Sequence, residues 1–369
     1  MHIAVIGASN AISAMGNVIE RSGRAYGLSR SRILENYYSG LLDGYKVNPT
    51  IADPYNPVEV LAKLSAAKLF SIGDMHVLKT ADAYMIDGTF GGTAASRTFD
   101  PYSVGKKRLR PTMMNFLNTT VVELAGFYKK KVIVTESATL SRIRGNYLSG
   151  HYKALLPKYY RMGADSWIGG RGRWCNPDSD GEQRLEAFIS DNASYGLTNI
   201  YGHKWLNSKN GFVLLIASLE HDPTHAYSSV EAHVLDTIRE LRKHTDRKIV
   251  LKPHPESEIN FEDIARAEKV DLLNKSVHLT KAARGCYCAA MDDSTSLFQL
   301  INLGIPCITS KLSFGAELGN CAISAVEDLT YPSSDQVLQW YRRMACTEFM
   351  NMEFGGLEIL KYVRELLDG

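Results

Sequence analysis

The sequence lacks any apolar run long enough to cross a membrane, which takes roughly 18 consecutive residues or more. Its first segment, Met1–Gly7, also lacks the basic start and long apolar core of a signal peptide. Charged residues make up 22% of the 369 residues and hydrophobic residues 45%, a globular composition in a chain long enough for two cores. We therefore expect a cytoplasmic chain without a membrane span.

Pairs of cysteines at metal-binding spacing are absent as well. The six cysteines form no CxxC pair, and Cys286 and Cys288 have the spacing of side chains on one face of a strand. We interpret the cysteines as reduced thiols that are buried as small hydrophobic residues. We interpret His221, His225 and His233 as parts of a solvated loop and helix face. No metal site is therefore expected.

A dinucleotide-binding fingerprint is also missing. Gly7 ends the first expected strand, but no second glycine follows before Gly16, so the G-x-G-x-x-G pattern is not present. This argues against an enzyme that uses NAD or FAD. The formal net charge of +2 is close to neutral and by itself indicates no partner.

The chain does contain apolar β-like runs that alternate with helical patterns, in two successive series. The strands expected in the first series are 2–6, 69–72, 83–86 and 131–135, and those in the second are 211–217, 248–251, 286–291 and 305–309. A helix opened by Ser228, with Glu231 three residues later as a capping box, follows the first strand of the second series. This alternation predicts α/β domains with mostly parallel sheets. We expect a first domain at 1–205, a second at 206–345, and a terminal helix in 346–369 that packs back on the first.

Two segments of the second series have side chains suited to binding an anion. Lys252-Pro253-His254-Pro255 follows a strand, and ligands of open parallel sheets bind beyond the carboxyl ends of the strands. The prolines bias Lys252 and His254 toward extended geometry, so a cation and an imidazole share one stiff loop. The simpler alternative is a solvated surface turn.

The second segment, Asp293-Ser294-Thr295-Ser296, joins an expected strand to an expected helix at 294–303. Hydroxyls and unpaired N–H groups at a helix start favour an anion. The same residues also suit an ordinary N-cap. Both segments are predicted at one sheet edge, which favours a shared site for a diphosphate.

The two anion-binding motifs, together with the segment that follows them, are similar to those of a known protein family. The Lys-Pro-His-Pro strand end, the later Ser-Thr-Ser helix start and Leu303–Ile308 together resemble the capsule polysaccharide biosynthesis and export family. Val132–Glu136 followed by Tyr159–Gly163 is similar to it too. The resemblance implies a GT-B fold, with two Rossmann-type domains whose parallel sheets face a central cleft, in a bacterial or phage-infected cell. It also implies that Lys252, His254 and the segment 293–296 bind the phosphates of a nucleotide-sugar donor.

The resemblance and the chemistry of sugar transfer suggest roles for further residues. Glu136 is the candidate general base, because transfer to a hydroxyl needs a carboxylate to take its proton. Alternatively, Glu136 pairs with Arg142 or Arg144. His254 is the other catalytic candidate, since it can meet the charge of the leaving group without a metal. Asp222 and Glu317 are weaker candidates for donor binding, Glu317 through a ribose hydroxyl.

The segment 141–175 is basic and aromatic. Cations that neutralise phosphates and rings that stack on bases are typical of nucleic-acid contacts. Alternatively, these residues pack loops over a cleft or bind the phosphates of the donor. As acceptor-binding candidates we take Arg142, Arg144, Arg161, Trp167, Arg171, Arg173 and Trp174.

The sequence therefore predicts a metal-independent glycosyltransferase with a nucleotide-sugar co-substrate and no permanently bound cofactor. Its acceptor is expected to be polyanionic, either a hydroxymethylated base in phage DNA or an acidic capsule-type glycan. A base in duplex DNA would have to be flipped out to reach the donor. A polyol-phosphate transferase or a sugar-nucleotide epimerase is an alternative on the same fold. A non-catalytic nucleic-acid-binding protein is an alternative of another class.

Overall fold

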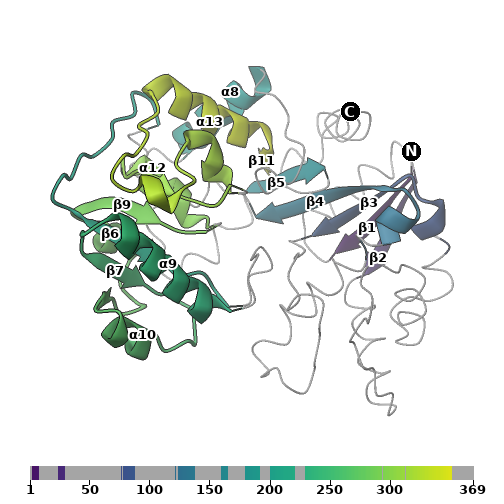
Figure 1. Cartoon of the computed structure of the whole chain (residues 1–369). Helices are drawn as coiled ribbons and strands as arrows, with labels where there is room; N and C mark the ends of the chain where they lie inside the picture. The colour runs from purple at the N-terminus through teal and green to yellow at the C-terminus, as the bar shows by residue number, and fades with distance from the viewer. Residues whose placement is uncertain are drawn as a thin grey trace, which may run out of the picture.

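The computed structural model of the chain contains two β-sheets in succession, with helices packed around the second (Figure 1). The residues that it describes are 2–7, 24–29, 76, 78–87, 121, 124–137, 159–164, 179–191, 200–220, 229–292, 294–311 and 313–350. The α/β class that the sequence predicts is confirmed. No helix in these ranges is long and apolar enough to cross a membrane.

The first sheet has six strands in the order β11-β5-β4-β3-β1-β2. Their bounds are β1 His2–Gly7, β2 Arg24–Ser29, β3 Ala83–Asp87, β4 Lys131–Ser137, β5 Tyr159–Ala164 and β11 Glu348–Met350. Strands β2, β1, β3 and β4 are parallel, whereas β5 and β11 are antiparallel to their neighbours. The first sheet is therefore mostly parallel, as predicted, with two antiparallel strands at one edge, a mixed arrangement that large sheets often adopt.

The second sheet has five strands, all parallel, in the order β10-β9-β6-β7-β8. Their bounds are β6 Phe212–Ile216, β7 Ile249–Lys252, β8 Asp271–Leu272, β9 Cys286–Ala290 and β10 Cys307–Ile308. Val213 and Leu215 of β6 pack into one hydrophobic cluster, and Leu214 and Ile216 into another. Burial on both faces explains why these strands read as continuous apolar runs.

Helices cover both faces of the second sheet. Their bounds are α8 Ser179–Asp191, α9 Val230–His244, α10 Glu262–Ala267, α11 Leu279–Ala282, α12 Ser296–Asn302, α13 Ser334–Cys346 and the 3-10 helices η4 Phe314–Leu318 and η5 Ile323–Ala325. The N-cap of α9 is Ser229, whose Oγ accepts from Ala232 N at 3.2 Å. The predicted start of this helix at Ser228 is therefore wrong by one residue, because Ser229 makes the capping bond.

In Figure 1, β3 and β4 of the first sheet run toward the half of the molecule that holds β6 and β9. This is the GT-B-like arrangement that the sequence predicts. The chain returns to the first sheet after α13, because β11 pairs with β5 from residue 348. The expected strand at 69–72 and the terminal helix beyond 350 lie outside the described residues.

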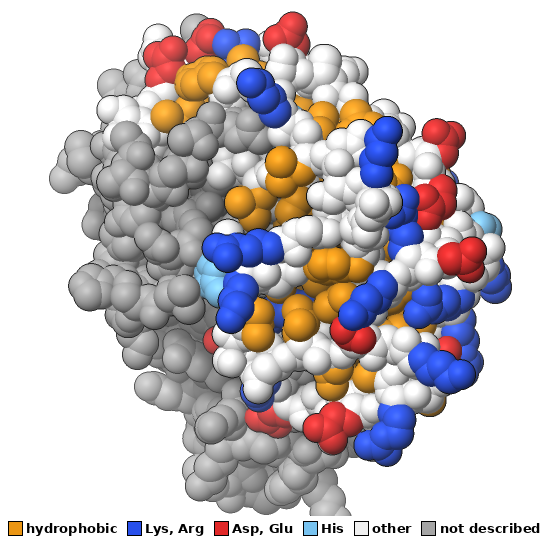
Figure 2. Space-filling view, turned by 90° about the vertical axis from the view of Figure 1, so that its left-hand side faces the viewer, with side chains coloured by type: hydrophobic (Ala, Val, Ile, Leu, Met, Phe, Trp, Pro, Cys, Tyr) orange, Lys and Arg blue, Asp and Glu red, His pale blue; other side chains and the backbone are white. Residues whose placement is uncertain are grey.

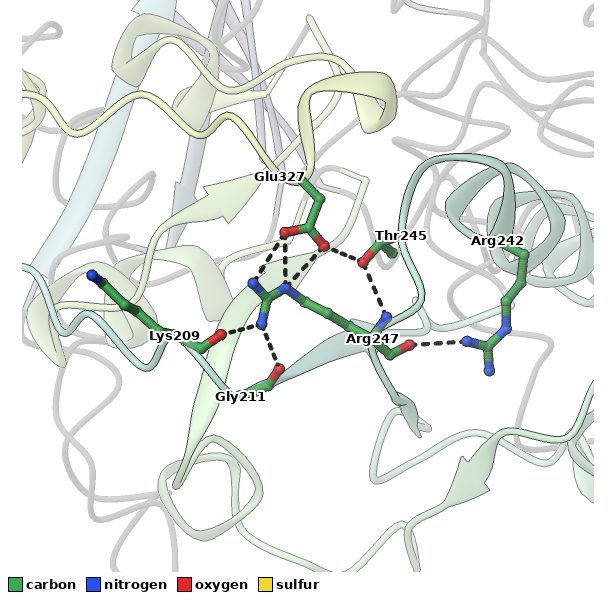
Figure 3. A network of polar contacts seen from close by, with 6 residues as sticks. All are labelled: Lys209, Gly211, Arg242, Thr245, Arg247 and Glu327. Atoms are coloured by element: carbon green, nitrogen blue, oxygen red, sulfur yellow. Dashed lines mark hydrogen bonds and ion pairs between the residues drawn. The ribbon is translucent and has the colours of Figure 1, made fainter.

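Arg247 fastens the opposite, amino edge of the second sheet (Figure 3). Its guanidinium donates to the carbonyls of Lys209 at 2.5 Å and Gly211 at 3.1 Å, and to both carboxylate oxygens of Glu327 at 3.0–3.2 Å. It also lies 3.7 Å from the ring centroid of Tyr287. One side chain therefore ties the segment before β6 to β9 and to the turn after η5.

Replacing Arg247 with Met is expected to lower the free energy of unfolding by about 2 to 3 kcal/mol, since charge-assisted hydrogen bonds and a cation–π contact are lost. Arg239→Met is the matched control. Its guanidinium, 59% exposed, makes an ion pair with Glu268 at 2.9 Å, and its removal should cost at most about 1 kcal/mol. Urea denaturation of both variants measures the difference, and equal losses would contradict the role of Arg247.

Candidate anion-binding site at the carboxyl edge of the second sheet

The register of the second sheet brings several loops to one edge. Lys252 ends β7 opposite Ile216 of β6, while Leu215 of β6 lies opposite Ala290 of β9, and Ala290 lies opposite Ile308 of β10. The loops that follow these four strands therefore begin at one level. Because β6 separates β7 from β9, the Lys-Pro-His-Pro loop and the segment after Met291 are about 10 Å apart at their starts.

Lys252 is buried, with 4% of its surface exposed. Its ammonium donates to the carbonyls of Pro253 at 2.7 Å and Lys275 at 3.0 Å, which uses two of its three donor hydrogens. Burial lowers the pKa of Lys252 to about 8. The ammonium thus holds a positive charge beneath the loop and joins it to the segment after β8.

His254 is partly exposed, and its Nδ1 accepts from Glu256 N at 3.2 Å. His278, the N-cap of α11, likewise accepts from Thr280 N at 3.4 Å. A neutral imidazole that accepts at Nδ1 carries its proton on Nε2 and donates from there. Burial and the nearby charge of Lys252 lower the pKa of His278. The edge therefore has two imidazoles that donate through Nε2 when neutral.

The segment after β9 contributes side-chain hydroxyls to this edge, and the helix that follows it is short. Ser294 Oγ accepts from Ser296 N at 3.3 Å, and Thr295 is the N-cap of α12 without a side-chain capping bond. The helix α12 has seven residues, shorter than predicted, so its dipole contributes less than the sequence suggested. Asp293 lies outside the described residues, whereas Ser294, Thr295 and Ser296 are partly exposed.

A longer helix also begins at this edge. Burial lowers the pKa of His233 in the first turns of α9, and the charge of Asp292 opposes this shift, which places His233 near the segment after β9. The helix α9 has 15 residues, so its positive dipole end reinforces the field of Lys252. Asp222, in the loop between β6 and α9, lies outside the described residues.

The loop after β10 forms another part of the edge. An added Cβ on Gly315 of η4 would lie 3.0 Å from two side-chain atoms of Thr309 and 3.1 Å from Leu297 in the first turn of α12. The 3-10 helix is therefore packed closely against the start of α12. Glu317 of η4 accepts from Arg343 of α13 at 2.7 Å, and burial raises the pKa of its carboxyl while Arg343 lowers it.

The first sheet contributes two of the residues expected from the sequence. Glu136 lies near the carboxyl end of β4 and opposite Arg161 of β5, but its side chain is outside the described part. Arg161 is 3% exposed, which does not fit the expected role as an acceptor ligand, because a buried guanidinium is not presented to a polymer. The other acceptor candidates lie outside the described residues: Arg142, Arg144, Trp167, Arg171, Arg173 and Trp174.

Three residues at the edge escaped prediction from sequence. Lys275 and His278 follow β8, which has only two residues and gave no strand signal, so nothing indicated that this segment would reach Lys252. His233 was read as a solvated helix face. The serine cap of α9, which was expected one residue too early at Ser228, is the signal that could have placed the first turn of this helix at the sheet edge.

The outer face of the second half carries mixed charge. Figure 2 shows Lys and Arg side chains interspersed with Asp, Glu and exposed hydrophobic groups. Several exposed cations of this half form ion pairs, among them Lys248 with Asp271 at 2.6 Å and Lys243 with Glu240 at 2.7 Å. Among the described residues, this pairing reduces the positive field of the face, whereas an extended basic field is the feature by which a nucleic-acid-binding surface is recognised.

No family model and no curated protein matches the chain. Solved structures similar to it include the β-Kdo 2,7-transferase KpsC of Thermosulfurimonas dismutans, 11% identical over 99% of both chains with a TM-score of 0.44. The UDP-GlcNAc 2-epimerase of Methanocaldococcus jannaschii is 11% identical over 99% of this chain and 100% of its own, with a TM-score of 0.34. The calicheamicin glycosyltransferase CalG4 is 11% identical over 100% and 98%, with a TM-score of 0.27. At such scores these likenesses do not bear on the function of the chain.

Gly315→Ala is expected to destabilise the chain by about 1 to 3 kcal/mol, because the added methyl group would press against the side chains of Thr309 and Leu297 at 3.0–3.1 Å. Gly126→Ala is the matched control. Gly126 is an exposed helical glycine with nothing within 4 Å of an added Cβ, so alanine should stabilise the chain by up to about 1 kcal/mol. Chemical denaturation compares the two, and a neutral Gly315→Ala would show that η4 is loosely packed.

Proposed function

We propose that the chain is a glycosyltransferase that takes a sugar from a nucleotide-sugar bound at the carboxyl edge of the second sheet. The observation that carries this proposal is the convergence of the Lys252–His254 loop and the hydroxyls of 294–296 on that edge. The resemblance of these two motifs to the capsule polysaccharide family supports the choice of donor. Asp293, Asp222 and Glu317 complete the proposed donor site.

The proposed reaction is a sugar transfer in which negative charge develops on the leaving nucleotide and must be stabilised. The acceptor oxygen forms a bond to the anomeric carbon while the bond from that carbon to the donor phosphate oxygen breaks. Glu136 takes the proton of the acceptor hydroxyl. His254 stabilises the negative charge that develops on the leaving nucleotide, and the hydroxyls of 294–296 donate to the same phosphates. The buried ammonium of Lys252 contributes through its positive field from beneath the loop. No metal is required in this scheme.

We propose a polyanionic acceptor bound by the basic, aromatic segment 141–175. Among its candidate ligands, the argument rests on Arg142, Arg144, Arg171 and Arg173 with the two tryptophans, since Arg161 is buried. An acidic glycan is favoured over DNA, because the paired charges on the second half give little attraction for a long duplex. An epimerase on the same fold would leave the sugar on its nucleotide.

The variants His254→Ala and Ser294→Ala test the donor site. We expect His254→Ala to lower the rate of sugar transfer by about a hundredfold or more, because a charge-stabilising group is lost. Ser294→Ala should raise the dissociation constant of the nucleotide severalfold, about 1 kcal/mol per lost hydrogen bond. Thermal shift with a panel of nucleotides and nucleotide-sugars, followed by product analysis, provides the readout.

His244→Ala and Ser276→Ala serve as controls for these two variants. His244 lies in the last turn of α9, at the far end from the site, and Ser276 donates to Asn274 within an exposed turn. Both should retain transfer and melting temperature. Undiminished transfer in His254→Ala and Ser294→Ala would refute the donor site.

The low pKa of Lys252 predicts a pH dependence of binding. As the pH rises from 7 to 9, an ammonium with a pKa of about 8 loses its proton, and the positive charge beneath the loop disappears. The affinity for a nucleoside diphosphate should then fall by up to about tenfold. The phosphates are already ionised above pH 7, so they do not contribute. Calorimetric titration should show this fall in the unaltered chain and not in Lys252→Met.

A further inference from the structure

Arg161 is a buried charge between two glutamate positions of the first sheet. In the antiparallel ladder, Glu136 of β4 lies opposite it on one side and Glu348 of β11 on the other. Glu348 is buried as well, with 4% of its surface exposed. Directly opposed residues of an antiparallel pair lie on the same face of the sheet, so the Glu348 carboxylate is placed to compensate the guanidinium of Arg161.

The guanidinium of Arg161 also reaches the second half of the chain. Its Cζ lies 5.4 Å from the ring centroid of Phe314, the first residue of η4. Phe314 is fixed from other sides, since its ring lies 5.7 Å from that of Phe298, and its carbonyl accepts from Trp340 Nε1 at 2.9 Å. A cation over an aromatic face is attractive, more so when both are removed from water.

The same 3-10 helix has a second link to the first sheet. Glu317 of η4 pairs with Arg343 of α13 at 2.7 Å, and α13 leads through Thr347 directly into β11. Met162 N, next to Arg161, donates to Thr347 O at 2.9 Å. These links form a closed ring. Arg161 contacts Phe314 and Glu317 pairs with Arg343, while the chain itself joins Phe314 to Glu317 within η4 and Arg343 to Glu348 through α13 and β11. The pairing of β11 with β5, which sets Glu348 opposite Arg161, closes the ring.

This ring ends at the proposed donor site. Gly315, which lies between Phe314 and Glu317 in η4, packs so closely against Thr309 and the first turn of α12 that an added Cβ would lie 3.0–3.1 Å from their side chains. A shift of η4 would therefore move the groups around Ser294–Ser296. Residues of the first sheet can in this way act on the proposed phosphate-binding groups of the second.

We propose that Arg161 is a positioning residue that holds η4 in place from the first sheet and thereby shapes the donor site. The inference deepens the proposed function, because it rests on η4 forming one wall of that site. It assigns Arg161 a role in linking the two halves of the chain, in place of the contact with a polyanionic acceptor that the sequence suggested. Arg343 shares this role through Glu317.

Amide hydrogen exchange of the ligand-free full chain tests the link without any assumption about the donor. Arg161→Met should raise exchange in residues 313–318 by about tenfold while β6, β7 and β9 keep their protection. Arg343→Gln should do the same. Because either change opens the ring, the double variant should exceed the single variants by little, a non-additive result that independent structural losses would not give.

Arg161→Lys keeps the charge beside Glu348 but loses the planar group over Phe314, so its exchange should fall between those of the unaltered chain and Arg161→Met. Arg239→Gln is the control, because it removes only the ion pair between exposed Arg239 of α9 and Glu268 after α10, and it should leave the exchange of 313–318 unchanged. Unchanged exchange in Arg161→Met would overturn the inference. So would a rise spread evenly over both sheets with a lower melting temperature.

Titration with UDP and CMP then separates the two proposals. If the unaltered chain binds either nucleotide, Arg161→Met should raise its dissociation constant by about tenfold while Arg239→Gln leaves it unaltered. An unchanged constant in Arg161→Met would overturn the effect on the donor site. If neither nucleotide binds the unaltered chain, the choice of donor fails, and the exchange data alone decide whether Arg161 holds η4.

Discussion

The buried ammonium of Lys252 constrains the edge on which the candidate site depends. A charge removed from water must be compensated by nearby polar groups, and here the carbonyls of Pro253 and Lys275 do so. They belong to the loops after β7 and β8, so one hydrogen-bonded cation fixes two loops at the carboxyl edge. Lys275 extends this link, because its own ammonium donates to Ser257 O at 2.9 Å. The site is thus held by the same charge that would attract a phosphate.

Other cationic side chains in the described part of the chain also link separate segments. Arg247 joins the segment before β6 to Glu327 at the amino edge, and Arg161 reaches from β5 to the ring of Phe314. Guanidinium groups suit these positions because they donate in several directions and stack on aromatic faces. The second sheet is therefore fastened at both edges by side chains whose charge is compensated locally.

The sequence predicted the second half of the fold better than the first. Continuous apolar runs located β6, β7, β9 and β10, since strands buried on both faces have no polar alternation. In the first domain no strand is expected at 24–29 or 159–164 and no helix at 179–191, yet the structure has β2, β5 and α8 there. The pairing of β5 with β11 joins residues far apart in the chain, and no local pattern records such a partner.

The candidate site could be located from sequence only as far as single loops allow. Lys252 and His254 were correctly placed at a strand end, because strand and turn signals are local. The Lys252 ammonium donates to the carbonyl of Lys275 only because β8 pairs with β7 and brings the segment after β8 close. Local sequence does not record this pairing. Arg161 shows the same limit of local sequence patterns. In the sequence it lies among basic and aromatic residues, whereas in the fold it lies opposite Glu348 and contacts Phe314. A guanidinium identified by local charge alone was thus assigned to an acceptor, and only the tertiary contacts connect it to η4 and so to the opposite side of the proposed site.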